Sequence, residues 1–454
     1  MAYHSYNPFT CKEEANFEFI SDIGLEKKLK LSEKRFPEWS QTPLSKRSEI
    51  LNRAADILEK DSGRHAKIIT REMGKPISQS LAEVKKCAWV SRYYAKNAGS
   101  FLEPGKLEST AEESYVRYDP LGIIFAIMPW NFPYWQTFRF LAPNLVSGNT
   151  ELLKHASNVP QCALAMEELF LKAGAPEGVF QNLFISYEQV ARVIGYDGVR
   201  GVTLTGSNYA GNRIAEIAGT HGKKTVLELG GSDPYIVFAD ADLEKAADCA
   251  IMARFQNNGQ SCIAAKRFIV EEQAFEPFMA LFKSRVESMK VGDPMDPETM
   301  IGPLARKDLL LELEDHIQHI IKQGGRILSG GKRLKEGCLI LEPTIVTGLP
   351  IDSPINDIEL FGPVIPVFSF KSDEEALKMA NHSRFGLGAS IWTGNRDRAD
   401  RFAKCIETGT VAVNGMVKSE PGLPFGGIKA SGYGRELSEI GMKEFLNIKT
   451  VNYF

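Results

Sequence analysis

Several features that mark specialised classes of protein are missing from this sequence. Its seven cysteines are an odd number and the closest two, Cys249 and Cys262, are thirteen residues apart, so there is no CxxC motif and a disulfide framework is not expected. The longest apolar run, residues 121–130, is about half of the roughly 20 residues that a membrane-spanning helix needs. The 54 basic and 57 acidic residues leave a net charge of −3, which gives no electrostatic reason to expect nucleic acid or a membrane surface as a partner.

The N-terminus also lacks a basic segment followed by an apolar one, and it is neither rich in arginine nor poor in acidic residues. We therefore expect no signal or transit peptide, and the cysteine usage favours a reducing, cytoplasmic environment. What remains is an ordinary globular composition over 454 residues, with 43% hydrophobic and 24% charged residues. This length and composition predict two or three domains with sizeable cores, acting on small molecules.

The hydrophobic pattern divides the chain. Up to about residue 94 the apolar side chains lie three and four apart, which predicts helices, and residues 104–118 are a candidate arm or linker. From residue 121, short apolar runs alternate with helix-length stretches over about 110 residues, as in a doubly wound parallel sheet. The alternation resumes after Gly231 and predicts a second α/β domain. The C-terminal NIKTVNYF alternates too, which predicts an edge strand and favours oligomerisation.

Cys262, in NNGQSCIAAKR, is the first candidate for chemistry. Small and polar residues precede it, as expected for a thiolate in a polar, accessible pocket. The alternative is a buried cysteine without chemistry, and we assign that role to the other six cysteines, which lie in helical or core-like segments.

Two polar residues at the ends of apolar segments are further candidates. Glu228, in VLELGG, lies where the carboxyl end of a parallel strand faces a ligand crevice, and burial there would raise its pKa toward that of a general base. The alternative is a strand-end carboxylate whose hydrogen bonds are satisfied. Asn131, in IMPWNFP, lies in a turn from which its amide could donate to an oxyanion, and the alternative there is an Asx turn.

Glycines mark a turn in LTGSNYAGNR, between an apolar strand and a helix. Gly206, Ser207 and Gly211 would let a backbone approach a pyrophosphate at the start of the helix. The spacing differs from GxGxxG, so a tight turn that needs positive φ is the alternative.

Taken together, these segments resemble the aldehyde dehydrogenase superfamily. MPWNFP, LTGS followed by Gly211, LELGG, GQSC, ELFGP and PFGGIKASGYGRE occur in that family's order, from roughly residue 20 to the C-terminus. The resemblance implies an α/β fold with two doubly wound Rossmann-like domains plus a small β oligomerisation arm. The implied divisions are a cofactor-binding domain (1–102 and 121–229), a catalytic domain (230–430), and the arm with the C-terminal tail (103–120 and 431–454).

The resemblance also implies catalytic roles. Cys262 would attack the aldehyde carbon, because a thiolate adds readily and leaves a thioester that water can cleave. The Asn131 side-chain amide and the Cys262 backbone amide would hold the oxyanion, and Glu228 would activate the water. Glu436, in GRE, matches a second acidic position that helps relay this proton, with a plain surface carboxylate as the alternative.

A nicotinamide cofactor is implied in the same way. Lys154 and Glu359 are expected at its two ribose ends, and the full set of matching residues is Trp130, Lys154, Gly206, Ser207, Gly211, Glu359 and Phe361. Family members that prefer NAD carry a glutamate three residues after this lysine, which binds the ribose hydroxyls and repels a 2′-phosphate. Here that position is Ser157, so we expect NADP to be preferred over NAD. The alternative is that Ser157 only caps the helix that begins near Pro160.

The substrate expectation depends on Arg139, eight residues after Asn131. The resemblance places it in the aldehyde tunnel, where the subgroup that acts on succinic semialdehyde carries arginine and many other members carry an aromatic residue. Its planar guanidinium can bind a carboxylate through two parallel hydrogen bonds. Ser419 matches a serine that assists it, and Trp135 and Phe425 would form apolar walls. The alternative is an arginine that faces solvent from a helix surface.

We therefore expect oxidation of succinic semialdehyde to succinate through a thiohemiacetal and a thioester, with NADP preferred and NAD used less well, in a homodimer or homotetramer. Another semialdehyde or small polar aldehyde is the nearest alternative, because one methylene changes binding by only about 1–3 kcal/mol. A non-catalytic protein of the same fold is a remote alternative, since it has no need of the catalytic residues.

Some members of the subgroup carry a second cysteine two residues after the catalytic one. Ala264 stands there, so no disulfide switch is expected.

Overall fold

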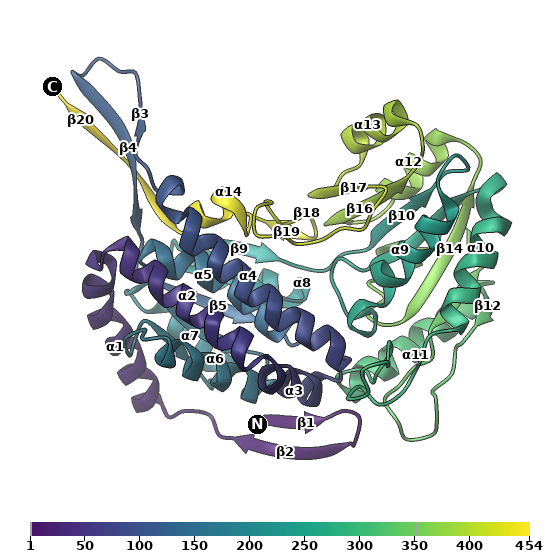
Figure 1. The fold of residues 1–454 in the computed structure, drawn as a ribbon, viewed down its shortest axis with the longest axis horizontal. Helices are drawn as coiled ribbons and strands as arrows, with labels where there is room; N and C mark the ends of the chain where they lie inside the picture. The colour runs from purple at the N-terminus through teal and green to yellow at the C-terminus, as the bar shows by residue number, and fades with distance from the viewer. Residues whose placement is uncertain (1, 351) are drawn as a thin grey trace.

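A computed structural model describes residues 2–350 and 352–454. Two α/β bodies lie side by side, and a thin β arm projects from the first of them (Figure 1). The α/β class with two Rossmann-like units and a β arm, predicted above, is confirmed.

The N-terminal segment begins with a hairpin that sequence patterning missed, β1 (Tyr3–Asn7) and β2 (Lys12–Phe17). The second strand, KEEANF, is mostly polar and has no buried face, so no alternation marks it. The predicted helices follow, and they are α1 (Asp22–Gln41), α2 (Leu44–Lys60), α3 (Ser62–Met73) and α4 (Ile77–Phe101).

The first sheet has the order β19-β9-β8-β5-β6-β7, and all its strands except β19 are parallel. Its strands are β5 (Ile123–Met128), β6 (Thr150–His155), β7 (Phe180–Asn182), β8 (Val199–Thr205), β9 (Lys224–Glu228) and β19 (Gly432–Tyr433). From the central β5 the chain continues outward through β6 and β7, and then returns to the other side through β8 and β9. Such a reversal opens a crevice at the carboxyl ends of β5 and β8, which is where ligands bind in this class.

Helices cover both faces of this sheet, because alternate residues of each strand point to opposite sides. Ile124 and Ala126 of β5 pack on one face in the core that α2 to α6 build, whereas Ile123 and Phe125 pack on the other with α1, α7 and α8. The connecting helices are α5 (Pro133–Ser147), α6 (Pro160–Lys172), α7 (Tyr187–Gly195) and α8 (Asn208–Thr220). All fifteen residues of α5 are buried, so this helix lies between layers rather than at the surface.

The second sheet has the order β12-β13-β14-β11-β10-β16-β17, with only β12 antiparallel. Its strands are β10 (Asp233–Val237), β11 (Ala265–Glu271), β12 (Arg326–Ser329), β13 (Thr344–Thr347), β14 (Val364–Phe370), β16 (Gly388–Trp392) and β17 (Thr410–Val413). Its helices are α9 (Leu243–Phe255), α10 (Glu272–Glu287), α11 (Lys307–Lys322), α12 (Asp373–Asn381) and α13 (Arg396–Cys405), with 3-10 turns η1 (Gln256–Gly259) and η2 (Pro354–Asp357). They also cover both sheet faces.

The C-terminal part returns to the first body. It adds a two-stranded pair of β15 (Phe385–Gly386) with β18 (Ile428–Lys429), the antiparallel β19, and the short helix α14 (Ser438–Lys443). The chain then ends in β20 (Leu446–Tyr453), which pairs along its whole length with β4 (Glu113–Pro120), and β3 (Gly105–Lys106) completes this arm. β20 lies at the edge of the three-stranded sheet, as its alternation predicts.

The expectation that six cysteines are core residues is only partly right. Cys87, Cys162 and Cys338 are buried and Cys249 is partly buried, but Cys11 and Cys405 are exposed. Cys11 ends the tight β1–β2 turn and Cys405 the last turn of α13, so both lie at element ends rather than on packed faces. Within the described part of the chain, no helix combines the length and apolarity needed to cross a bilayer, and no cluster of three metal-ligating side chains occurs.

Candidate active site

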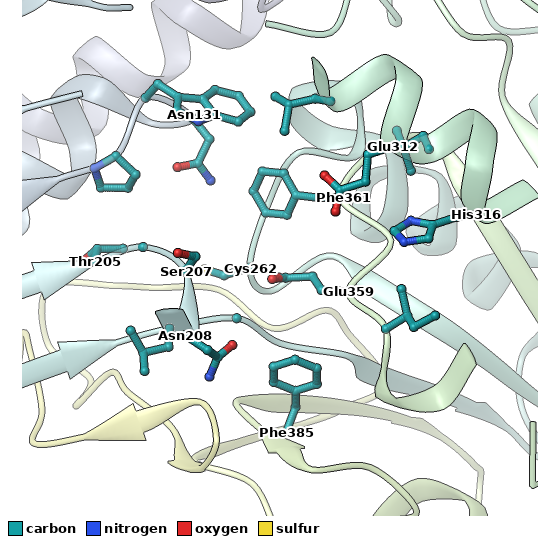
Figure 2. Close-up of a pocket in the computed structure, with 18 of the residues that line it drawn as sticks. Asn131, Thr205, Ser207, Asn208, Cys262, Glu312, His316, Glu359, Phe361 and Phe385 are labelled. Atoms are coloured by element: carbon teal, nitrogen blue, oxygen red, sulfur yellow. The ribbon is translucent and has the colours of Figure 1, made fainter. Parts of the chain in front are cut away.

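Two cavities meet at Cys262. The first, of about 570 Å³, lies at the carboxyl ends of β5, β8 and β9, and Figure 2 shows Cys262 near its centre with Asn131 on one side and Phe385 on the other. The second, of about 370 Å³, lies between α4, α5 and the loop 416–425. Cys262 and Gln136 line both, so a group in either cavity can reach the same sulfur atom.

The loop that carries Cys262 is held rigidly. Asn257 and Asn258, just after α9, adopt left-handed backbone conformations with φ of 58°. The Asn257 side chain donates to the carbonyls of Asn131 (2.6 Å) and Gln260 (2.9 Å), and Lys266 Nζ donates to the Cys262 carbonyl at 2.7 Å. The polar residues before Cys262 therefore serve as buried scaffolding for the loop.

The state of the Cys262 thiol differs from the sequence expectation. Cys262 is partly buried, and its five preceding residues are all buried rather than forming a wet, accessible rim. Burial first, and the nearby Glu228 carboxylate second, raise the pKa of the Cys262 thiol well above its ordinary value. The resting sulfur is thus a thiol, and a base must take its proton before it can act as a nucleophile.

Glu228 is in the position to do so. It ends β9, is buried, and its Oε2 lies 3.6 Å from Cys262 Sγ. Burial raises the pKa of Glu228 to about 7, which Glu436 also favours and Arg139 opposes. A carboxylate that titrates near neutrality can accept a proton from the thiol or from water.

The two glycines of LELGG are required because neighbouring groups approach the backbone closely there. An added Cβ at Gly231 would lie 2.5 Å from the Cys262 carbonyl oxygen, and one at Gly230 would lie 2.5 Å from the Glu359 carboxylate. Only glycine lets the chain leave β9 between these two groups.

Arg139, on α5, is buried and does not face solvent, so the surface alternative is wrong for it. Its guanidinium forms an ion pair with Glu436, lies 3.5 Å from Glu228 Oε2, donates to Thr205 Oγ1 at 3.2 Å, and covers the ring of Phe425. Glu436 is buried too, which excludes the surface alternative for it. Burial raises its pKa and Arg139 opposes that shift.

Asn131 follows β5 and is buried beside the first cavity. Its Nδ2 donates to the Gln260 carbonyl at 3.0 Å, which leaves the second hydrogen of this amide for another acceptor. An Asx turn is not what holds it, because the residue two positions on, Pro133, has no backbone N–H to donate. The side chain is anchored to the cysteine loop instead.

Five of the residues expected at the cofactor line the first cavity, namely Trp130, Gly206, Ser207, Glu359 and Phe361. Ser207 caps α8 by accepting from the Ala210 amide. Glu359 accepts from the Gly231 amide at 3.0 Å and pairs with Lys266 at 3.3 Å. Gly211 does not reach the cavity, since an added Cβ would lie 2.5 Å from Leu229, so its absence of a side chain lets α8 pack on the sheet.

The cavity suits a dinucleotide on its own observations. It lies at the strand-order reversal and beside the start of α8, its volume falls in the usual range for ligand sites of roughly 300–1,000 Å³, and the rings of Trp130 and Phe361 form an apolar wall. An added Cβ at Gly206 would find only Leu204 nearby, at 3.5 Å, so this glycine leaves open space for a ligand.

Lys154 and Ser157 do not line this cavity, and lie near the end of β6 and in the loop that follows. Burial lowers the pKa of Lys154 to about 8, and its ammonium lies over the rings of Tyr3 and Tyr187. Ser157 is exposed and does not cap α6, whose N-cap residue Val159 has no side-chain cap. The capping alternative for Ser157 is therefore wrong.

The predicted substrate residues Arg139, Ser419, Trp135 and Phe425 all line the second cavity. Trp135 Nε1 donates to Ser419 Oγ at 2.8 Å, which joins α5 to the loop 416–425. The same cavity contains Lys86, from α4, whose Nζ lies 3.1 Å from Ser419 Oγ.

Comparison with known proteins agrees with this geometry. The model of the aldehyde dehydrogenase family matches residues 1–451. The chain belongs to the aldehyde dehydrogenase family. Among curated relatives of this aldehyde dehydrogenase, the probable succinate-semialdehyde dehydrogenase [NADP(+)] of Synechocystis is 47% identical over 99% of both chains, and that of Mycobacterium leprae is 43% identical over 99% of both. The crystal structure of succinic semialdehyde dehydrogenase from Streptococcus pyogenes in complex with NADP+ is 41% identical, with a TM-score of 0.97 over 99% of both chains.

Two lysines at the site of this aldehyde dehydrogenase were not predicted from the sequence. Lys266 Nζ donates to the carbonyls of Ser261 (2.8 Å) and Cys262 (2.7 Å). Its position only four residues after Cys262 could have marked it as a neighbour of the site. Lys86 lies in EVKKCAWV, an ordinary amphipathic helix, and no local signal distinguishes it from Lys85. Only the packing of α4 against α5 brings Lys86 to the cavity.

Proposed function

We propose that this aldehyde dehydrogenase oxidises succinic semialdehyde to succinate with reduction of NADP+, and uses NAD+ less well. The observation that carries the proposal is the second cavity, which leads to Cys262 and is lined by buried donors, Arg139 and Ser419, suited to a substrate carboxylate. Relatives named succinate-semialdehyde dehydrogenase [NADP(+)] over the full chain length support it.

The first step is proton transfer from Cys262 to Glu228 over the 3.6 Å that separate them. The thiolate attacks the aldehyde carbon, and the C=O electron pair moves to oxygen. The free hydrogen of Asn131 Nδ2 and the Cys262 backbone amide stabilise that oxyanion as a thiohemiacetal forms.

Collapse of the oxyanion re-forms C=O while the C–H bond breaks and the hydrogen leaves with its electron pair, so that a thioester remains on Cys262. A nicotinamide in the first cavity would supply the acceptor for this hydride. Trp130 and Phe361 wall that cavity, and Glu359 would hold the nearer ribose while being oriented by Gly231 and Lys266.

Hydrolysis completes the cycle. After Glu228 has released the Cys262 proton, it takes a proton from water and the resulting hydroxide attacks the thioester. The C–S bond then breaks, and the leaving sulfur takes that proton from Glu228, which gives the acid and the Cys262 thiol. Glu436 lies within the same buried charge network through Arg139, and would pass the surplus proton onward.

The preference for NADP follows from Ser157 and Lys154. The exposed Ser157 hydroxyl and the Lys154 ammonium would donate to a 2′-phosphate, and no carboxylate at position 157 repels it. Oxidation of another semialdehyde or small polar aldehyde is the second candidate, since Arg139 recognises a carboxylate but does not measure chain length.

The test is the initial rate of reduced-cofactor formation with succinic semialdehyde and with butanal, each with NADP+ and NAD+. We expect fast turnover with the semialdehyde and a higher kcat/KM with NADP+. Equal kcat/KM for the two aldehydes would contradict carboxylate recognition, and equal use of the two cofactors would contradict the role of Ser157.

We assign cofactor binding to residues 1–102 and 121–229, catalysis to 230–430, and assembly into a homodimer or homotetramer to 103–120 with 431–454. The projecting arm, with Ile448 61% exposed and Tyr453 55% exposed, supports an assembly role (Figure 1). Seven free cysteines support the cytoplasm as the compartment. Light scattering on the wild type and on a chain truncated after residue 445 tests the assembly.

A further inference from the structure

We propose that the N-terminal hairpin of β1 and β2 positions the loop 155–159 for cofactor choice, through the Tyr3 ring and the backbone amide of His4. The inference deepens the proposed function, because it rests on the role of Ser157 and Lys154 toward the 2′-phosphate of NADP+. It makes the hairpin, which lines neither cavity, a determinant of the preference for NADP+.

The hairpin is fixed to the first body by tertiary contacts. It lies against α3 and α6 (Figure 1), and Tyr3 and Ser5 of β1 are buried while His4 between them is exposed. On the second strand, Glu14 pairs with Arg71 of α3 at 2.9 Å. A two-stranded hairpin is marginally stable by itself in water, so these contacts order it. Its position relative to the loop 155–159 is therefore defined.

The backbone of His4 is bonded directly to the loop. In an antiparallel pair, every second residue of a strand directs its N–H away from the partner strand. The His4 N–H is such a group, and it donates to the Ser157 carbonyl at 3.0 Å. This bond fixes the Ser157 backbone and leaves its side chain exposed. A donor whose position is fixed in advance loses less conformational entropy when it binds a phosphate.

Tyr3 orients the ammonium of Lys154. The Tyr3 hydroxyl donates to the Ile185 carbonyl at 3.3 Å, and the centre of its buried ring lies 5.6 Å from Lys154 Nζ. Tyr187 places a second ring 5.3 Å from the same atom. Burial lowers the pKa of Lys154 to about 8, and no carboxylate of the described residues contributes to that pKa. Ring faces attract a cation without neutralising it, so the ammonium is oriented and its charge is available to an anion.

The end of the loop is bonded to the same strand. Gln161 Nε2, in the first turn of α6, donates to Ser5 Oγ at 2.7 Å. Glu72 of α3 accepts from the backbone amides of Gln161 and Cys162, each at 2.9 Å, and so caps α6, whose N-cap residue has no side-chain hydrogen bond. β1 is therefore bonded to the middle of the loop and to the first turn of the helix that follows it.

The first test isolates the backbone bond. His4→Pro removes the donated hydrogen, and it leaves the β1–β2 bonds intact because this N–H is not one of them. His4→Ala is the matched control, since both variants lose the imidazole and its 2.8 Å contact with Glu13. The probes are adenosine 2′,5′-bisphosphate and adenosine 5′-monophosphate, which differ only in the 2′-phosphate. Titration calorimetry on the full-length enzyme gives the Kd of each.

We expect the Kd of the bisphosphate to be about three- to tenfold higher in His4→Pro than in His4→Ala, as for loss of one hydrogen bond, and that of the monophosphate to stay within about twofold. Equal values for the bisphosphate in the two variants would overturn the inference. An equal loss for both nucleotides would overturn it too, because a body that is only destabilised does not distinguish them.

Tyr3→Leu and Tyr3→Phe form a second pair, which tests the inference even where the proline variant does not fold. Leucine removes the ring, whereas phenylalanine keeps it and loses only the hydroxyl. We expect the bisphosphate Kd to be about three- to tenfold higher in Tyr3→Leu than in Tyr3→Phe, with the monophosphate Kd within about twofold. Thermal unfolding monitors the fold of each variant. Equal bisphosphate values would show that the ring only packs on Phe184, at 4.7 Å between ring centres, and would overturn its positioning role.

The wild-type enzyme separates this inference from the proposed function. If it binds the bisphosphate no more tightly than the monophosphate, the 2′-phosphate is not recognised and the proposed preference for NADP+ is wrong. If it binds the bisphosphate more tightly but neither pair of variants differs, that preference stands and the role of the hairpin is wrong. Tighter binding in wild type together with a difference within both pairs supports the inference.

Discussion

The two cavities that meet at Cys262 are built by different means. One wall of the first is formed by the carboxyl ends of β5, β8 and β9, with glycines at the positions where a side chain would block a carboxylate or a carbonyl, and side chains of α11 and of the loops 357–361 and 384–385 form the opposite wall. The second is formed by side chains of α4, α5 and the loop 416–425, and its walls hold several buried charges. Local chain geometry thus shapes one wall of the first cavity, whereas the second depends throughout on side chains brought together by long-range packing.

This difference bears on function. A site made of strand ends and glycines suits a ligand that many relatives share, because backbone positions change little with side-chain substitution. A site made of charged side chains can be altered by one residue, so it decides which aldehyde is accepted. The following substitutions separate the shared sulfur chemistry from the two kinds of cavity.

The largest expected effect is at the sulfur atom that both cavities share. Cys262→Ala should reduce turnover by about 10⁴-fold or more with every aldehyde, because no other nucleophile lies at this position. Binding of NADP+, followed by titration calorimetry, should stay within a few-fold. Cys405→Ala, an exposed cysteine, is the control. Retained activity in Cys262→Ala would remove it as the nucleophile.

A large loss is also expected for Glu228→Gln, of about 10²–10⁴ in kcat, as for loss of a general base. The Glu228 pKa of about 7 means that the wild-type kcat/KM rises as pH increases through 7, because the carboxylate must be ionised to accept the Cys262 proton. In the variant this rise should shift to alkaline pH, where the thiol ionises by itself. A rise near pH 7 that persists in Glu228→Gln would assign that titration to another group.

Arg139→Met tests whether the second cavity and the catalytic carboxylates depend on the same guanidinium. Removing one partner of a buried ion pair costs about 3–5 kcal/mol, so Glu436 and Glu228 should take up protons more readily. We expect about a tenfold loss of kcat/KM on butanal and a larger loss on succinic semialdehyde. A loss confined to the semialdehyde would mean that Arg139 acts only on the substrate carboxylate.

The smallest loss of overall turnover is expected in the cofactor region, where a substitution changes mainly the choice between NADP+ and NAD+. Ser157→Glu should lower kcat/KM for NADP+ relative to NAD+ by about 10- to 100-fold, because a carboxylate would face the 2′-phosphate. Ser284→Glu, which adds the same charge on the exposed face of α10, should leave the ratio unchanged. If the ratio does not move in Ser157→Glu, the 2′-phosphate lies away from position 157.

The sequence predicted the first cavity better than the second. Short apolar runs that end in glycine or a polar residue located β5, β8 and β9, and with them Asn131, Gly206 and Glu228, because strand period and turn chemistry are local properties. The N-terminal hairpin was not predicted, because β2 is mostly polar on both faces and shows no alternation. Gly211 was predicted to lie at the cofactor, whereas in the structure it lies on α8, where it packs against Leu229.

By itself, then, the sequence determined the alternation of strands and helices, the order of the motifs and the identity of the residues at the strand ends. The tertiary structure decided the charge states. Neighbours up to 333 positions away in the chain decide three properties. They decide whether Cys262 rests as a thiol, whether Arg139 pairs with Glu436 or binds a substrate, and whether Lys86 faces solvent or a cavity. Burial and ion pairing are set by long-range contacts, and no local pattern of residues encodes them.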